Sequence, residues 1–257
     1  DREFQTLASS EVKLDNYNIT ISVSNFRDLV IKNKAGDILE ERKISGASSI
    51  YEFKHKDKVH YALEGSCYIA GAAVQWLRDN FKIVNNSAEV ETLAGSVENL
   101  EEMEHLMFLP FFTGMGTPYW NADAKGAIVG LTRDTAPKHL ARACLDGIAL
   151  SINDSISVII DESPTTVTEI KVDGGASQNN LLMQIQSNFS TMDIIRPKVI
   201  ETTAYGVALG SLIGLNKIDF SDLENLWKKE KSFSPVEKPY FVEKQKQWNS
   251  YIKKLYT

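Results

Sequence analysis

One stretch constrains the fold of this chain more than any other: residues 170–180, which read Ile-Lys-Val-Asp-Gly-Gly-Ala-Ser-Gln-Asn-Asn. A short β-branched run reaches an acidic residue and two adjacent glycines, and small polar residues then lead into an amphipathic segment. Paired glycines permit left-handed backbone angles and let a ligand approach the backbone with no Cβ in the way. The free N–H groups of a helix start suit a phosphate or another polar ligand. The stretch therefore predicts a strand, a glycine turn and a helix start, which fits a nucleotide site and also an ordinary tight turn.

Composition limits the class of protein. The chain has 257 residues, of which 43% are hydrophobic and 24% charged, as is typical of a globular protein with a buried core. A formal net charge of -6 argues against a partner that is a nucleic acid or an anionic membrane, because no basic excess exists to neutralise phosphates. The histidines and the distant Cys67 and Cys144 show no metal-ligand spacing, so no protein-held metal is predicted. The few cysteines and the lack of a signal peptide favour the cytoplasm, and no apolar run is identified as a membrane span.

The first part of the chain reads as a β-rich module of antiparallel character. Alternating or β-branched runs predict strands at residues 18–24, 28–32, 36–43 and 59–63. A helix is expected next, with Ser66 as a candidate N-cap. Gly71 inside that helix either allows close helix packing or leaves a flat surface for a ligand, and Gln75 lies one turn further along the same face.

The rest of the chain predicts a mixed α/β order, with the glycine-bearing turns at the ligand edge. Residues 86–105 form an acidic run, which is expected to be a solvated helix or loop. The remaining expectations, in chain order, are a buried strand at 107–112, an ordered loop at 113–121, a long core helix at 132–160 with Pro137 near its first turn, a strand at 193–197, a helix at 201–211 whose small residues pack on the sheet, and a tail at 228–257 with a loop and one amphipathic helix.

Four blocks of the chain resemble the FGGY carbohydrate kinases, and among them the enzymes that phosphorylate glycerol. The blocks are residues 61–79 (Tyr-Ala-Leu-Glu-Gly-Ser to Trp-Leu-Arg-Asp), 113–133, 172–180 and 203–208. They stand in the family's order and cover most of residues 61–215. The resemblance implies that residues 1–257 form the C-terminal nucleotide-binding domain of a two-domain kinase. Its expected fold is the α/β, actin/Hsp70/hexokinase-like (ribonuclease H-like) ATPase domain, a mixed sheet with helices on both faces.

The resemblance also implies the site and its ligands. By position, Gly71, Gln75, Gly174, Gly175 and Asn179 resemble the family's contacts to ATP or ADP. The nucleotide, with Mg²⁺, would bind in the cleft between two domains, and its γ-phosphate would pass to a hydroxyl of a polyol, glycerol in the first instance. The partner would be the N-terminal, polyol-binding domain of the same protein, which residues 1–257 do not include. The chain alone is therefore expected to be inactive, and homo-oligomer formation is left open.

The acceptor half of the site is implied by an ungapped alignment of residues 1–26. Asp1 then resembles the catalytic base, and Phe26 resembles the aromatic residue that packs on the glycerol carbons. A carboxylate suits this chemistry, because it takes the proton of the attacking hydroxyl while metal and donors stabilise the phosphoryl charge.

The same alignment shows a departure from the family pattern Thr-x-Gly-Thr-Gly-x-Phe, a turn that holds the transferring phosphate. The two glycines are replaced by Ser22 and Ser24, and the second threonine by Val23. Cβ atoms then stand where the backbone should approach phosphate, and one donor is lost. Two alternatives to a glycerol-specific enzyme follow: an impaired kinase homologue that binds nucleotide or a partner without turnover, and an FGGY kinase for another sugar or polyol.

Overall fold

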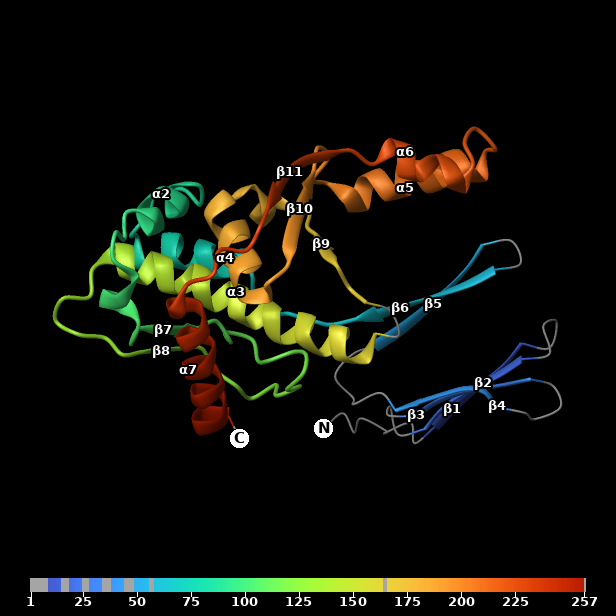
Figure 1. Ribbon diagram of the computed structural model, residues 1–257, viewed down its shortest axis with the longest axis horizontal. Helices are drawn as coiled ribbons and strands as arrows, with labels where there is room; N and C mark the ends of the chain where they lie inside the picture. The colour runs from blue at the N-terminus through green and yellow to red at the C-terminus, as the bar shows by residue number, and fades with distance from the viewer. Residues whose placement is uncertain are drawn as a thin grey trace.

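The computed structural model describes residues 9–14, 19–24, 28–33, 38–43, 49–55, 58–163 and 166–256. Strands dominate the first part and helices alternate with short strands in the rest, so the predicted mixed α/β class is confirmed (Figure 1). The strands belong to several small sheets, of which one is mixed and the others antiparallel.

The opening module is antiparallel, as its alternating pattern predicts. Its strands are β1 (Ser9–Leu14), β2 (Ile19–Ser24), β3 (Asp28–Asn33), β4 (Ile38–Lys43), β5 (Ser49–His55) and β6 (Lys58–Glu64). The first four form a meander in the order β1-β2-β3-β4, and the last two form a separate hairpin. Within each of these two groups, strands that follow one another in the chain are antiparallel neighbours.

The remaining elements follow in chain order. They are α1 (Gly71–Trp76), η2 (Leu77–Phe81), α2 (Glu89–Gly95), η3 (Leu100–Met103), β7 (Met107–Leu109), β8 (Ala127–Val129), α3 (Pro137–Glu162), β9 (Glu169–Lys171), η4 (Gly175–Gln178), α4 (Asn180–Ser190), β10 (Asp193–Pro197), α5 (Thr202–Gly214), η5 (Phe220–Asp222), α6 (Leu223–Leu226), β11 (Lys229–Phe233) and α7 (Pro239–Tyr256).

Helix α3 is the centre of the core. Its apolar stripe packs against α1, α2, α4 and the fully buried strand β7, and Cys144 and Ile148 are completely inaccessible. The helix begins at Pro137, not at residue 132, because Pro137 is suited to a first helical position and residues 132–135 form a separate turn, in which Thr135 Oγ1 accepts the N–H of Thr132. In its second half the buried residues include Asn153, whose Nδ2 donates to Gln245 of α7.

By length and composition α3 is also apolar enough to cross a membrane, which the sequence analysis did not identify. More than half of its most apolar stretch, 56%, is buried inside the protein. The helix is therefore accounted for as the core helix around which the other elements pack.

The start of α1 corrects a second expectation. The helix begins at Gly71 with Ala70 at the N-cap, so Ser66 does not cap it. Instead, the loop that carries Ser66 is tied to another loop, since its N–H donates to Thr117 Oγ1 at 2.9 Å and its carbonyl accepts the N–H of Thr117. The cap signal was misleading because this serine's backbone is engaged by a distant part of the chain.

The glycine turn lies in a β-α-β unit. Strands β9 and β10 are parallel, and α4 connects them and packs on β10. Strand β11 adds antiparallel to the other side of β10, which completes a mixed sheet in the order β11-β10-β9. The turn at residues 174–178 therefore stands at the carboxyl end of β9, the edge at which open α/β sheets bind ligands.

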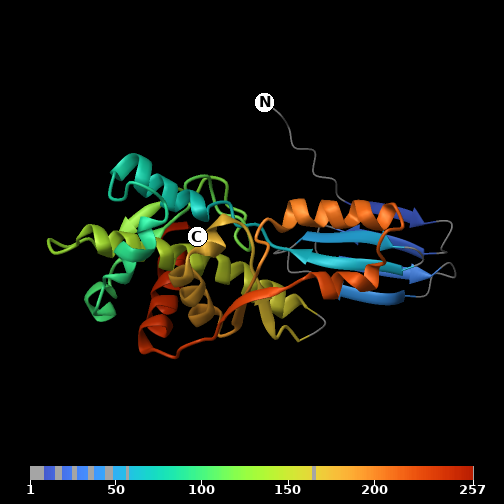
Figure 2. The same cartoon turned by 90° about the horizontal axis from the view of Figure 1, so that it is seen from above.

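Helix α5 does not pack on the mixed sheet, contrary to expectation. None of its described residues is buried, and the exposed fractions of Val207 and of Leu215, just after the helix, are both 68%. Figure 1 and Figure 2 both place α5 and α6 at the end of the molecule that holds β5 and β6, away from α7. Small residues permit close packing, but they do not determine which surface a helix contacts.

The C-terminal tail contains the predicted amphipathic helix, α7, and also a strand, β11, that the sequence analysis missed. Trp248 of α7 is completely buried and donates Nε1–H to Asp154 Oδ2 at 2.7 Å. The same carboxylate accepts the hydroxyl of Tyr119 at 2.9 Å. Burial raises the pKa of Asp154 to about 6. These contacts join α7, α3 and the loop at residues 113–121.

Candidate functional site

One cleft brings the predicted nucleotide residues together. Its volume is about 720 Å³, which is in the usual range of small-molecule sites. It lies between α1, the beginning of α2 and the turn that joins β9 to α4. Around it stand Gly71, Gln75, Gly174, Gly175 and Asn179. These residues come from segments far apart in the sequence, and their role in binding stays a prediction.

The two glycines leave part of the cleft wall open. Gly174 has φ 74° and ψ 171°, a conformation that residues with a side chain adopt only with strain. Its N–H donates to the carbonyl of Ile200 at 2.8 Å, and its carbonyl accepts the hydroxyl of Ser177 at 2.7 Å. No described heavy atom lies within 4 Å of the place that a Cβ would take on Gly174 or Gly175. A ligand can therefore approach the backbone directly.

Asn179 has a structural role beside its predicted binding role. It is the N-cap of α4, and its Oδ1 accepts the N–H of Leu182 at 2.8 Å. This bond satisfies one of the free donors of the helix start. Among the described residues none pairs with its Nδ2, so the amide hydrogens are available to a ligand in the cleft.

Helix α1 forms the opposite wall. Gly71 and Gln75 lie one turn apart on its cleft side, while Ala73 is buried in the core and is not among the lining residues. A Cβ on Gly71 would stand 3.7 Å from the Cβ of Ala176, which is ordinary van der Waals contact. The glycine therefore widens the cleft at the point where α1 approaches the turn.

Helix α2 supplies a wall of the cleft that was not predicted from the sequence. Ser87 and Glu91 line the cleft from this side, and the buried side chains of Val74, Val90 and Leu182 form its apolar base. The acidic composition of residues 86–105 led to the prediction of a solvated face. The apolar spacing of Val90 with the residues four and seven positions later was the available signal of an amphipathic helix with one side in the core.

The charges of the cleft favour the nucleoside end of a nucleotide. Among the described residues that line it, two are carboxylates, Glu91 and Asp173, and none is a lysine or arginine. An apolar base suits a planar heterocycle, and carboxylate and amide groups suit N–H and O–H groups. The described part of the chain holds no cluster of three or more metal-ligating His, Cys, Asp or Glu side chains.

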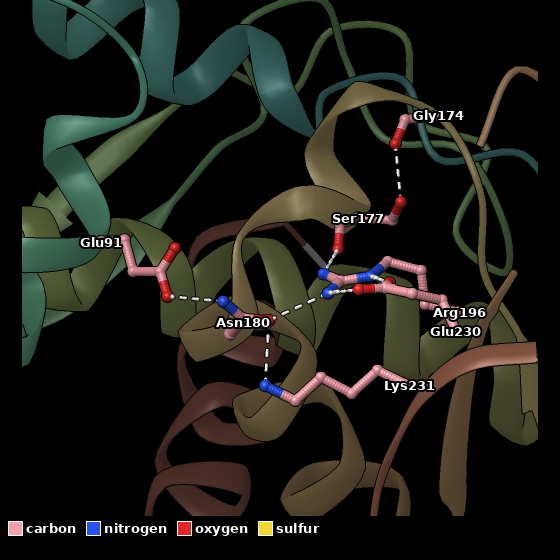
Figure 3. Close-up of polar contacts among 7 residues, drawn as sticks. All are labelled: Glu91, Gly174, Ser177, Asn180, Arg196, Glu230 and Lys231. Atoms are coloured by element: carbon pink, nitrogen blue, oxygen red, sulfur yellow. Dashed lines mark hydrogen bonds and ion pairs between the residues drawn. The ribbon is translucent and has the colours of Figure 1, made fainter. Parts of the chain in front are cut away.

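A buried arginine supports the glycine turn from beneath (Figure 3). Arg196 of β10 donates from Nη1 to the carbonyl of Ser177 at 2.6 Å and from Nη2 to Asn180 Oδ1 at 3.1 Å. Its Nε pairs with Glu230 of β11 at 2.5 Å. A guanidinium presents its donors in a rigid fork, so these contacts fix the turn relative to both strands.

The acceptor half of the predicted site lies in part outside the described residues. Asp1 and Phe26 both fall there, so their predicted roles are not tested. The proposed phosphate turn at Ser22–Ser24 lies in β2, where each residue has partners in both β1 and β3. These residues are therefore part of a regular ladder, whose N–H groups are directed toward the neighbouring strands, and not part of a turn.

The fold and the cleft define a domain of the actin/Hsp70/hexokinase ATPase class, with a glycine turn at a strand end facing a helix. Within this class the match is specific. The chain belongs to the FGGY family of carbohydrate kinases, because the model of the family's C-terminal domain matches residues 38–214. The resemblance seen in the sequence is thereby confirmed.

Known relatives agree with this assignment. The chain is 46% identical over 182 residues to a glycerol kinase of Paraburkholderia phytofirmans, and 45% identical over 181 residues to one of Saccharolobus islandicus. Each match covers 70% of this chain and 36% of the relative, so the chain spans about a third of the length of the curated relatives it matches. A crystal structure of Plasmodium falciparum glycerol kinase with ADP superposes with a TM-score of 0.71 at 25% identity, over 97% of this chain and 47% of that one.

Proposed function

We propose that this chain is the ATP-binding, C-terminal domain of an enzyme that transfers the γ-phosphate of ATP to glycerol. The observation that carries the proposal is the cleft, around which Gly71 and Gln75 of one segment face Gly174, Gly175 and Asn179 of another. Two kinds of similarity support it: the identity with glycerol kinases and the likeness to a glycerol kinase crystallised with ADP. A cytoplasmic location is proposed with it, since ATP is the phosphoryl donor.

Each part of the site has a distinct task in this proposal. The glycine turn and α1 hold the nucleotide, and the apolar base of the cleft excludes water from one face of its ring system. Asp1 is proposed to take the proton of the acceptor hydroxyl, and Phe26 to pack on the acceptor's carbons. When bound with ATP, Mg²⁺ would offset the charge of the phosphates. A polyol-binding domain would supply the other contacts to the acceptor and close over it.

Gly175→Val is expected to weaken ADP binding at least about tenfold without unfolding the protein. The valine side chain projects into open space in the cleft, where it meets no described atom, so it competes with a ligand and not with the fold. Titration calorimetry with ADP measures this effect, and a coupled assay of glycerol-dependent ADP release on the full-length protein measures turnover.

The matched control is Gly206→Val, which is equally free of described neighbours but lies on α5, outside the cleft. It should bind ADP as the wild type does. Equal affinity of the wild type and of Gly175→Val would show that the nucleotide site is elsewhere. The proposed function itself would be refuted if the wild type did not bind ADP, or if the full-length protein did not form ADP from ATP in the presence of glycerol.

Asn179→Asp and Asn179→Ala are expected to separate capping from binding. Aspartate keeps the N-cap acceptor for the N–H of Leu182, so stability is unchanged, but it replaces the free amide donor by a negative charge and weakens ADP binding about tenfold. Alanine loses both groups and also lowers the free energy of unfolding by about 1 kcal/mol. Thermal unfolding and ADP titration on each variant test the pair. If Asn179→Asp binds ADP normally, the amide hydrogens do not contact the nucleotide.

A further inference from the structure

A carboxylate of α2 stands in the cleft in a position that side-chain contacts determine. Glu91 lines the cleft, is half-buried, and comes from the helix that carries the apolar base residue Val90. Its Oε1 accepts a hydrogen bond from Asn180 Nδ2 at 3.3 Å, across the gap between α2 and α4 (Figure 3). This contact joins the two helices at one end of the cleft and leaves the second carboxylate oxygen for a ligand.

The orientation of Asn180 follows from two cations. Arg196 Nη2 and Lys231 Nζ both donate to Asn180 Oδ1, at 3.1 Å and 3.2 Å. A positively charged donor requires an oxygen acceptor, so the amide nitrogen must face Glu91. Arg196 is itself fixed by Glu230 and by the carbonyl of Ser177. The position of the Glu91 carboxylate is therefore supported through contacts that reach β10 and β11.

We infer that Glu91 is a specificity-determining residue of the nucleotide site, which accepts a hydrogen bond from an N–H or O–H group of the nucleoside. The inference rests on the proposed function. A carboxylate accepts hydrogen bonds and repels phosphate, and the described cleft lining has no lysine or arginine to offset it. The group it recognises is therefore on the nucleoside: the 6-amino group of adenine or a ribose hydroxyl.

The two sources of the donor give different discrimination. If Glu91 accepts from the 6-amino group, inosine diphosphate places a carbonyl oxygen against the carboxylate, and two acceptors then face each other. If Glu91 accepts from the ribose, 2′-deoxy-ADP or 3′-deoxy-ADP leaves the carboxylate without its partner. A site built to bond a donor rejects the analogue that lacks it strongly, because its own polar group stays unpaired.

The test measures the affinities of ADP, inosine diphosphate, 2′-deoxy-ADP and 3′-deoxy-ADP for the full-length protein and for Glu91→Gln and Glu91→Ala. The wild type should bind ADP about tenfold or more tightly than one of the analogues. Glu91→Ala should lose most of that preference, since it weakens ADP and leaves the analogue unchanged. Glu91→Gln keeps an acceptor for Asn180 and adds a donor, so it should raise the affinity for inosine diphosphate if the base is the group recognised.

Glu98→Gln is the control, because Glu98 is exposed after α2 and is not among the lining residues. This variant should behave as the wild type.

Two results would overturn the inference while the proposed function stands. One is that the wild type binds ADP and that Glu91→Ala binds each of the four nucleotides with the same affinity as the wild type. The other is an equal loss for all four nucleotides in Glu91→Ala, which would make Glu91 a structural link between α2 and α4 and not a reader of the ligand. Absence of ADP binding by the folded wild type would instead refute the proposed function and, with it, the inference.

Discussion

Gly147→Ala is expected to destabilise the protein by about 3 kcal/mol, although alanine is the better helix former. Gly147 lies in the buried part of α3, and a Cβ there would stand 2.1 Å from the carbonyl oxygen of Phe108 in β7. That oxygen belongs to the backbone of a fully buried strand, so it cannot rotate away. The helix and the strand would have to separate, and this cost exceeds the gain of about 1 kcal/mol from helix propensity.

Gly210→Ala is the matched control. Gly210 also lies inside a helix, α5, but no described atom stands within 4 Å of the place of its Cβ. Only the propensity term then remains, and the free energy of unfolding should rise by up to about 1 kcal/mol. Urea unfolding of the two variants measures both values, provided that the slope with denaturant is unchanged. A Gly147→Ala variant as stable as the wild type would mean that α3 and β7 are further apart than described.

Local sequence signals predicted an element well where the geometry of that element itself produces the pattern. The stripe through Cys144 and Ile148 predicted a buried helix because helical periodicity itself creates a buried face. Strand β11 was missed since its sequence, Lys-Glu-Lys-Ser-Phe, is charged, and an edge strand carries such residues while its pairing is decided by β10. Helix α5 was predicted, but its packing on the sheet was not confirmed, because the composition of a helix does not specify which surface it contacts.

The candidate site divides in the same way. The turn at Gly174 and the helix start that comes after it follow from local backbone chemistry, so the sequence indicated both directly. Glu91 stands in the cleft only because α2 packs on α3, and Arg196 supports the turn only because β10 lies beside β9. In the sequence both are ordinary charged residues, because their partners are distant in the chain and become neighbours only in the fold.

Lys244→Met is expected to destabilise the protein by about 2–3 kcal/mol at neutral pH. Lys244 is completely buried on α7, in the stripe that also carries Trp248. Its Nζ donates to the carbonyls of Met103, Glu104 and Leu106 at 2.5–2.9 Å, and so holds the segment between η3 and β7. Methionine preserves the apolar stem but leaves these carbonyls without their shared donor, and an unpaired buried acceptor costs about 1–3 kcal/mol.

The pH dependence of this loss identifies its cause. Burial lowers the pKa of Lys244 to about 8 against the opposing attraction of Asp146 and Glu104, while in the unfolded chain the group keeps its ordinary value of 10.5. Between these values the unfolded state binds more protons than the native state, so the contribution of Lys244 to stability rises with pH. The difference in unfolding free energy between wild type and Lys244→Met should therefore grow from pH 8 to pH 10, by about 1 kcal/mol for each pH unit. Only the difference is informative, because burial also raises the pKa of groups common to both proteins, Tyr240 and Cys144 among them, and these lower the stability of both at alkaline pH.

Lys246→Met, an exposed position on the same helix, should change stability by less than about 0.5 kcal/mol and show no such growth with pH. Denaturant unfolding of the three proteins at pH 7, 8, 9 and 10 decides the matter, and a pH-independent difference for Lys244→Met would show that the ammonium is not held in a buried site.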